Sequence, residues 1–235
     1  MDWTSGDNTL AMQGKYLQLR ATTSASAGTT HTITASAGSV SDAWTIKTTP
    51  TNCYDGEIGT VCADGSVYAG TTPDGDVPFY VTRCDAGQTW DGSACTGARA
   101  LPKGNNGQDD WTDTTIVNCG SVPGCDPSGE SSTAILISED SDSDDPGIQT
   151  HDAAQYCADL NLHGQTDWYL PSAPELNILH TNKTAIGNFR TTNPSSFWSS
   201  SEVNNVNFWI HDFYSGAQSG FGSKWSSLLV RCARK

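Results

Sequence analysis

The chain has 235 residues, a formal net charge of -14, 23 glycines, 8 cysteines and 8 tryptophans. Only 16% of the residues are charged and no run approaches the roughly 20 apolar residues of a membrane span, which argues against coiled coils and membrane insertion. The acidic balance argues against nucleic acids and polyanions as partners, because binding phosphates or sulfates needs clustered Lys and Arg side chains.

Residues 1–49 are rich in Thr, Ser, Ala and Gly and contain no cysteine. The stretches 15–20, 31–35 and 43–47 alternate apolar and polar side chains, which is the period of half-buried strands. Three or four such strands make only part of an immunoglobulin-like sandwich of about 100 residues. We therefore expect a short all-β, immunoglobulin-like stub over 1–49.

The composition changes at Thr49 and Pro50. From there to about residue 130 the chain is rich in Gly, Asp and Cys, and it lacks helical periodicity. Residues 79–83 are the one convincing strand in this part, and residues 104–130 resemble a long surface loop. We expect disulfides to hold this Cys-rich stretch, which opens a second domain over 50–235.

Two helices and several strands are expected in the last 90 residues. Residues 153–160 place apolar side chains at helical spacing, with Cys157 on the inward face. Residues 172–175, SAPE, form a capping box with proline in the first turn. Short strand patterns follow, at 197–198, 208–213 and 228–232.

The cysteines indicate an oxidising compartment. Their number is even, none stands in a C-x-x-C motif, and their scattered spacing favours disulfides over a zinc ribbon or a redox motif. The sequence opens MDW without a basic start or an apolar stretch, so we expect a signal in upstream sequence or export within a particle such as a virion.

Several motifs occur in a characteristic order. They are CADGSVYAG at 62–70, YVTRCDAGQTW at 80–90, HGQTDWYLPS at 163–172 followed by Glu175 and Leu176, FWSSSE at 197–202, then Trp209, Phe213 and Gly216, and VRCAR at 230–234. This combination resembles the Lcl C-terminal domain family, named for a bacterial collagen-like adhesin, over roughly residues 60–235.

The resemblance implies an α+β, C-type lectin-like fold with two helices, small antiparallel sheets and disulfides. It also implies an extracellular binding role without enzymatic activity. In that fold a cysteine of the first helix commonly bridges to one in the last strand, and Cys157 and Cys232 occupy those places. Such a bridge is worth about 4 kcal/mol in the chain-entropy picture. For the other six cysteines we favour pairs between sequence neighbours: Cys53 with Cys62, Cys84 with Cys95, and Cys119 with Cys125.

The same fold serves as the variable protein of some diversity-generating retroelements, whose C-terminal residues vary. Adenine mutagenesis of Asn codons cannot yield Trp, Gln, Lys, Glu or Met, yet four of the 27 residues from 203 to 229 are of these types. The whole chain contains 29 residues of these types among 235, so these types are not depleted in the tail. The composition neither supports nor excludes hypervariation.

The tail mixes aromatic rings with Ser, Gly and Asn, as antibody paratopes do. Trp209, Phe213 and Gly216 match scaffold positions of the family, and alternation places Trp209, His211 and Phe213 on one strand face. If that face is core, the opposite face and the following loop form the binding site. The candidate ligand-binding residues are Asn205, Asn207, Phe208, Ile210, Asp212, Tyr214, Ser219, Phe221, Ser223 and Trp225. The competing interpretation is ordinary loop sequence with some rings folded inward.

Metal and catalytic motifs are weak. Asp140, Asp142 and Asp144 imitate the start of an EF-hand loop, but Asp145 and His151 stand where it needs Gly and Glu, so a solvated acidic loop is favoured over calcium binding. The sugar-binding calcium motifs of C-type lectins are absent, as are H-E-x-x-H and G-x-S-x-G motifs. We therefore expect no cofactor, no metal site and no enzymatic activity.

The sequence predicts an extracellular, cell-surface or virion-surface protein that displays a C-terminal surface, with or without hypervariation, to a protein or glycan ligand. The adhesin namesake suggests polyanionic sugars, which the charge of this chain opposes. The alternative is a structural tip or assembly module of a secreted appendage or phage particle. Oligomerisation, for example as a trimer, is left open.

Overall fold

The computed structural model describes residues 30–37, 40–47, 53, 57–104, 126–138, 151–204 and 206–235. The chain divides into two compact units, Met1–Asp55 and Gly56–Lys235. Among the described residues, no helix is long and apolar enough to cross a bilayer. The second unit contains all of the predicted binding residues.

The first unit contains one antiparallel hairpin. Strand β1 (Thr30–Ala37) pairs with β2 (Val40–Lys47), and Ile33 lies opposite Trp44. The predicted strands at 31–35 and 43–47 are therefore present, whereas the one expected at 15–20 lies outside the described residues. The immunoglobulin-like character of this unit stays a prediction.

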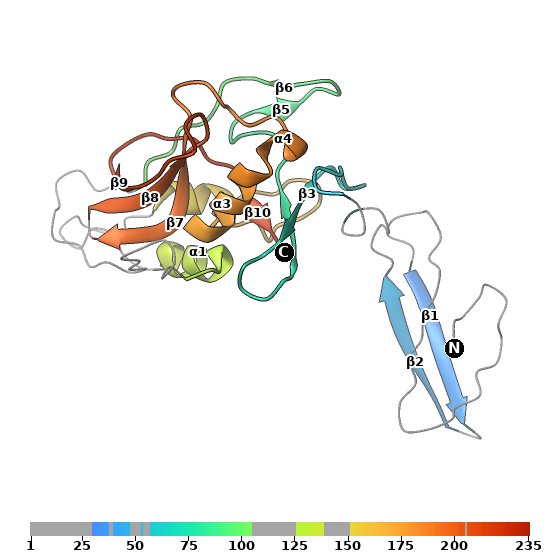
Figure 1. Cartoon of the computed structure of the whole chain (residues 1–235). Helices are drawn as coiled ribbons and strands as arrows, with labels where there is room; N and C mark the ends of the chain where they lie inside the picture. The colour runs from blue at the N-terminus through green and yellow to red at the C-terminus, as the bar shows by residue number, and fades with distance from the viewer. Residues whose placement is uncertain are drawn as a thin grey trace. The chain divides into compact units, whose positions relative to one another are not determined.

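Small antiparallel sheets and a few helices make up the second unit (Figure 1). One sheet has the order β10-β4-β3 and brings the two ends of the unit together, and a second pairs β5 with β6. The bounds are β3 (Val67–Thr71), β4 (Pro78–Val81), β5 (Thr89–Trp90), β6 (Cys95–Thr96) and β10 (Ala233–Arg234). Strand β4 falls on the strand predicted over 79–83.

Four helices are present in the described residues. They are α1 (Gly129–Ser138), α2 (Asp152–Ala158), α3 (Ala173–Thr181) and α4 (Lys183–Ile186). Helices α2 and α3 confirm the two that the sequence predicts. Helix α1 was missed, because its sequence GESSTAILIS combines Ser, Thr and β-branched Ile, residues with weak helix propensity, and shows little amphipathic periodicity.

The capping box at the start of α3 is confirmed. The Ser172 hydroxyl accepts a hydrogen bond from the Glu175 amide, and the Glu175 carboxylate accepts one from the Ser172 amide at 2.9 Å. The same carboxylate also accepts from the Gly129 amide at 3.1 Å and from the Tyr169 hydroxyl at 3.1 Å. One buried side chain therefore serves the amino-terminal ends of both α1 and α3.

Replacing Ser172 with alanine is expected to lower the free energy of unfolding by about 1 kcal/mol, the usual cost of losing an N-cap. The variant loses the cap to Glu175 and the hydrogen bond from the Ser172 hydroxyl to the Pro127 carbonyl. Chemical denaturation followed by tryptophan fluorescence measures the change. Thr181→Ala, which removes an exposed hydroxyl of the same helix, is the control and should be close to wild type.

Disulfides tie the second unit together. Cys157 of α2 is bonded to Cys232 across 75 residues, and Cys84 is bonded to Cys95. Both predicted pairs are confirmed. Cys53 and Cys62 are each disulfide-bonded, and Cys119 and Cys125 lie outside the described residues.

The third sheet of the second unit has the order β7-β8-β9. Its strands are β7 (Ser196–Asn204), β8 (Asn207–Asp212) and β9 (Gln218–Ser223). The predicted strand at 228–232 is an extended segment instead, in which Leu229 bridges to Phe197 and the Val230 carbonyl accepts from the Ala86 amide. The result is a mixed α and β fold with small antiparallel sheets, as the sequence predicts.

Candidate ligand-binding surface

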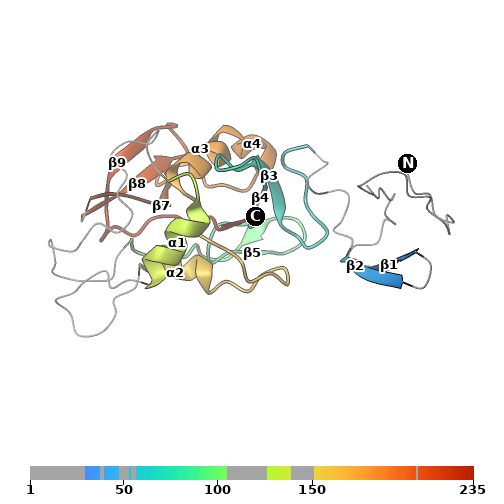
Figure 2. The ribbon, with the colours of Figure 1, turned by 90° about the horizontal axis from the view of Figure 1, so that it is seen from below.

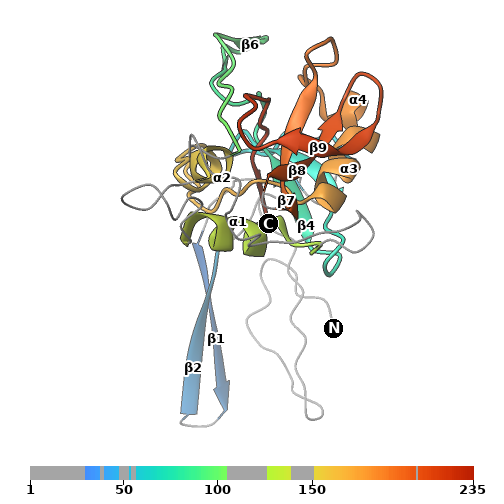
Figure 3. The ribbon, with the colours of Figure 1, turned by 90° about the vertical axis from the view of Figure 1, so that its left-hand side faces the viewer.

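The β7-β8-β9 sheet, which carries most of the predicted binding residues, is covered on both faces. Helices α1 and α2 lie on one side of it and α3 and α4 on the other (Figures 2 and 3). Two separate apolar clusters fill the spaces between the sheet and these helices. The sheet is therefore an internal layer of the unit over much of its length.

One cluster lies between the sheet and α3. It contains Phe197 of β7 and Phe213 after β8, whose ring centroids are 4.5 Å apart, together with Leu176 and Leu179 of α3. His211 is buried on this side and packs edge-on against Phe213. The prediction that Phe213 belongs to the core is correct, and His211, placed on the same strand face, is buried with it.

The opposite face of β8 is also core. Phe208 is only 2% exposed and packs edge-on against Trp198 and His151, with Ile210 half-buried beside this cluster. The expectation that Phe208 and Ile210 form an open face is therefore wrong. Alternation separated the two faces correctly, but α1 and α2 cover the second one, and the residues of α1 show little helical periodicity.

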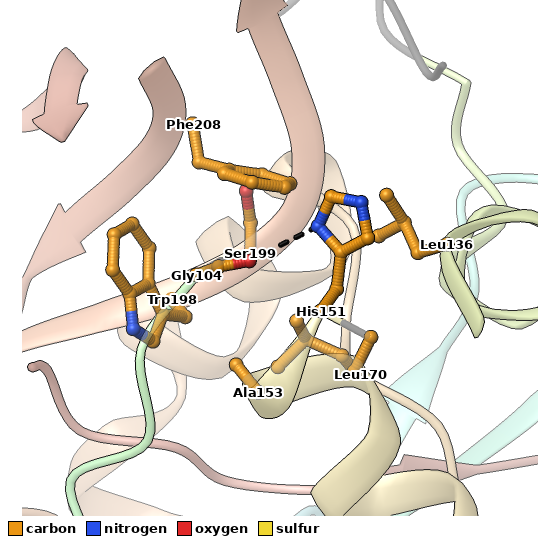
Figure 4. A pocket seen from close by; sticks show the side chains of 9 residues that line it. Gly104, Leu136, His151, Ala153, Leu170, Trp198, Ser199 and Phe208 are labelled. Carbon is orange, nitrogen blue, oxygen red and sulfur yellow. Dashed lines mark hydrogen bonds between the residues drawn. The ribbon is translucent and has the colours of Figure 1, made fainter. Parts of the chain in front are cut away.

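The gap around Phe208 is a packing space rather than a ligand pocket (Figure 4). It measures about 170 Å³ including its open side and is lined mainly by apolar side chains, among them Leu136, Leu170 and Trp198. No room for a water molecule remains between these described side chains. His151 reaches across it and makes a hydrogen bond of 3.0 Å to the Gly104 carbonyl.

Two glycines allow β9 to approach β8 closely. A Cβ atom at Gly222 would lie 2.3 Å from the Ile210 side chain and 3.0 Å from the Phe208 carbonyl. A Cβ at Gly220 would contact Val203 and the ring of Trp209. Trp209, expected in the core, is therefore half-buried against the β9 backbone.

Asp212 organises the turn between β8 and β9. One carboxylate oxygen accepts from the amide and hydroxyl of Ser215, at 2.6 and 2.7 Å, and the other accepts from the hydroxyls of Ser195 and Ser196. Although partial burial opposes it, this set of donors lowers the pKa of Asp212 to about 2. Asp212 is a structural residue of the turn. A ligand that binds its carboxylate, as predicted, would have to compete with these four hydrogen bonds.

Lys224, directly after β9, is buried and forms an ion pair with the buried carboxylate of Glu202 on β7. Its ammonium group also lies 5.1 Å from the centroid of the Phe208 ring. This pair could not be predicted from local sequence patterns, because the two residues are 22 positions apart. Residues 203–229 contain only two formally charged residues, of which Lys224 is buried in this ion pair and Asp212 is half-buried and hydrogen-bonded in its turn.

Four more of the predicted ligand-binding residues are partly buried. Asn207 donates from its backbone and side-chain nitrogens to the Asn204 side-chain oxygen. Ser219 and Ser223 are half-buried in β9, and Trp225 is half-buried just after it. Asn205 lies outside the described residues. None of these four described side chains is fully exposed.

Tyr214 and Phe221 are the rings that reach solvent. Tyr214, in the turn after β8, is 71% exposed, and Phe221, in β9, is 88% exposed. Among the described residues they are the most exposed large apolar side chains and the only aromatic ones in that group. We call the exposed part of residues 209–225 the hairpin surface.

The described residues contain no group of three or more His, Cys, Asp or Glu side chains placed to hold a metal ion. The acidic run from Glu139 to Asp145, where calcium was considered, lies outside them. The preference for a solvated acidic loop over calcium binding there stays a prediction.

Residues 81–234 match the model of the Lcl C-terminal domain family. The chain belongs to this family. The match covers almost all of the motifs on which the resemblance depends, from the motif at 80–90 to VRCAR at 230–234. It leaves out the motif at 62–70. No curated protein matches the chain. Membership of the Lcl C-terminal domain family suggests a surface or adhesin-like role, and the disulfides agree with an extracellular location.

Proposed function

We propose that this protein is an extracellular or particle-surface binding protein, and that its hairpin surface contacts a protein or glycan ligand on another surface. The Lcl C-terminal domain supports the adhesin-like role. The observation that carries the choice of surface is the exposure of Tyr214 and Phe221 on one hairpin. Exposed rings forgo burial worth roughly 2 kcal/mol each, so a partner that covers them gains that free energy.

The charge distribution favours a ligand that is not strongly charged. The formal charges of Asp212 and Lys224 sum to zero, so the net charge of -14 resides outside residues 203–229; Lys224 is buried against Glu202, and Asp212 is held by serine donors. The hairpin surface thus carries one partly exposed charge, the Asp212 carboxylate, on an otherwise strongly acidic protein. Binding there should depend little on salt, and polyanionic sugars should be repelled at long range by the rest of the chain.

We further propose a C-type lectin-like fold and no catalytic activity. The bridge from α2 to the C-terminal segment and the short sheets support the fold. The structural partners of Asp212 and Lys224 support the absence of catalysis. If the tail is hypervariable, variation should concentrate at solvent-facing positions such as Tyr214 and Phe221, and sequencing of the native locus tests this.

The double variant Tyr214→Ala with Phe221→Ala is expected to lose at least about ten-fold in binding affinity, because it removes both exposed rings. Arrays of neutral glycans and of extracellular proteins are probed with the labelled full chain and then with the variant. Heparin serves as the polyanion and should give no signal. For any captured ligand, raising the salt from about 0.05 to about 0.5 M should change affinity less than about three-fold.

The matched control is Leu101→Ala with Ile135→Ala, which removes two exposed apolar side chains elsewhere. It should bind like the wild type. Equal loss in both double variants, or strong salt-sensitive binding to heparin, would contradict the assignment of the hairpin surface.

The alternative is a structural tip or assembly module. The hairpin surface would then pack against a subunit of the same particle. Concentration-dependent association of the pure chain that the Tyr214 and Phe221 substitutions abolish, without capture of any arrayed ligand, would favour this alternative.

A further inference from the structure

Two histidines stack beneath the turn of the hairpin surface. His180 near the end of α3 and His211 of β8 have ring centroids 4.3 Å apart and an interplanar angle of 27°. Both rings also pack edge-on against Phe213. This pair joins the helix side of the unit to the strand that leads into Tyr214.

His211 is held as a neutral ring. It is 1% exposed, and neither ring nitrogen has a well-formed hydrogen bond among the described residues, although the Gly216 backbone lies close enough to interact with the ring. Burial, with the nearby His180 and Lys183, lowers the pKa of His211 from 6.5 to about 4, although the Gly216 backbone and Asp212 oppose the shift. A proton on this ring would be a buried charge whose loss of hydration the Gly216 backbone and Asp212 offset only in part.

His180 is also held neutral. The Lys183 ammonium at the start of α4 lies 2.6 Å from His180 Nε2 and donates to the Phe213 carbonyl at 3.0 Å. A charged lysine can only donate, so Nε2 must accept and the ring cannot carry a second proton. Burial and Lys183 together lower the pKa of His180.

Among the described residues of the elements around the two rings, Asp212 is the one carboxylate that acts on both histidines. Helix α3 contributes His180, and its other titratable residue, Glu175, sits at the opposite end of the helix; α4 contributes Lys183. Strand β7 carries only Glu202, which pairs with Lys224 and lies opposite Phe208, and β9 carries no titratable residue. On β8 itself, Asp212 is already committed to Ser195, Ser196 and Ser215.

We propose that His180, His211 and Lys183 form an acid-sensitive contact that holds the β8–β9 hairpin against α3 and α4 at neutral pH and releases it on acidification. Protonation of both rings would place three positive charges side by side, so the closed arrangement is disfavoured. This contact would regulate ligand binding because the turn that it holds carries Tyr214, and that role rests on the proposed function. The contact itself does not depend on any ligand.

The sign of the effect follows from the lowered pKa. The closed form takes up protons less readily than the open form, so its stability falls as the pH drops from 6.5 toward about 4. Asp212, with a pKa of about 2, stays ionised over this interval. Between about pH 7 and about pH 5, His211 alone should raise the open population about 20-fold.

Hydrogen–deuterium exchange of the full chain tests the proposal, with rates corrected for the intrinsic effect of pH. Backbone amides of residues 209–218 should lose protection about 20-fold in the wild type between about pH 7 and about pH 5. In His211→Phe, which keeps an aromatic ring but cannot titrate, this loss should disappear or fall to a few-fold. Unchanged protection in the wild type, or a full loss in His211→Phe, overturns the proposal.

His163→Asn is the matched control, because His163 is a distant, partly buried histidine whose pKa is also lowered. Its φ of 61° suits asparagine, and this variant should keep the wild-type response. If His211→Phe fails to fold, the His211 pKa in the wild type decides by NMR titration: a value below about 5 supports the proposal and one near 6.5 overturns it. Exchange is read without ligand, so failure of the proposed function leaves this result unaffected.

Discussion

Replacing Arg231 with alanine is expected to lower the free energy of unfolding by about 3–5 kcal/mol, the cost of breaking a buried ion pair. The guanidinium is 1% exposed and donates from Nε and Nη2 to one Asp85 oxygen, at 2.9 and 2.7 Å. Its Nη1 donates to the carbonyls of Thr82 and Arg83. Alanine would leave the buried Asp85 carboxylate and both carbonyls without these donors.

Chemical denaturation followed by tryptophan fluorescence measures this loss. Arg231→Lys should recover only part of the stability, because an ammonium cannot reproduce the planar set of donors. Arg190→Ala is the control, since that guanidinium bonds exposed carbonyls of Thr192 and Asn193. A loss in Arg231→Ala no larger than in Arg190→Ala would show that the Asp85 pair is not essential.

Phe208→Ala is expected to destabilise the protein by about 3–5 kcal/mol, whereas Phe221→Ala should change stability by less than about 0.5 kcal/mol. Both are phenylalanines of the same hairpin, but one is 2% and the other 88% exposed. Removing the Phe208 ring opens a cavity beside Trp198 and leaves the Lys224 ammonium without its aromatic neighbour. Phe221 makes no comparable contact with the residues that the structure describes.

The same two variants separate stability from binding. Phe221→Ala should fold normally and lose ligand affinity, and Phe208→Ala should mainly lose stability. Thermal and chemical unfolding report the first property, and the ligand arrays report the second. Equal destabilisation by both substitutions would mean that Phe221 is packed in solution, and the hairpin surface would then be assigned wrongly.

Local features of the fold were predictable because nearby residues determine them. The SAPE sequence specifies its own N-cap geometry, and Cys157 sits on the inward face of a periodic helix. The VRCAR motif carried the family resemblance, and each of its polar anchors has a partner far away in sequence. Arg231 binds Asp85, and Arg234 binds Asp64 while its guanidinium lies over the ring of Tyr80.

The candidate site was only partly predictable. Alternation along β8 sorts side chains onto two faces, but it contains no information about which face another element covers. Helix α1 has weak propensity and no clear stripe, so its contribution to burying Phe208 could not be foreseen. The environment of His211 depends likewise on His180 and Lys183, which are about 30 residues away in the chain.

The sequence by itself determined the family, the mixed α and β class and an aromatic-rich tail of zero net charge, because motifs, composition and short-range periodicity encode these, and the family resemblance implied the disulfide from α2 to the C-terminal segment. Only the tertiary structure decided which aromatic residues of that tail meet solvent. Exposure is a property of the whole packing arrangement: α1 and α2 bury Phe208, α3 buries Phe213, and nothing in the described residues covers Tyr214 and Phe221 to a similar extent.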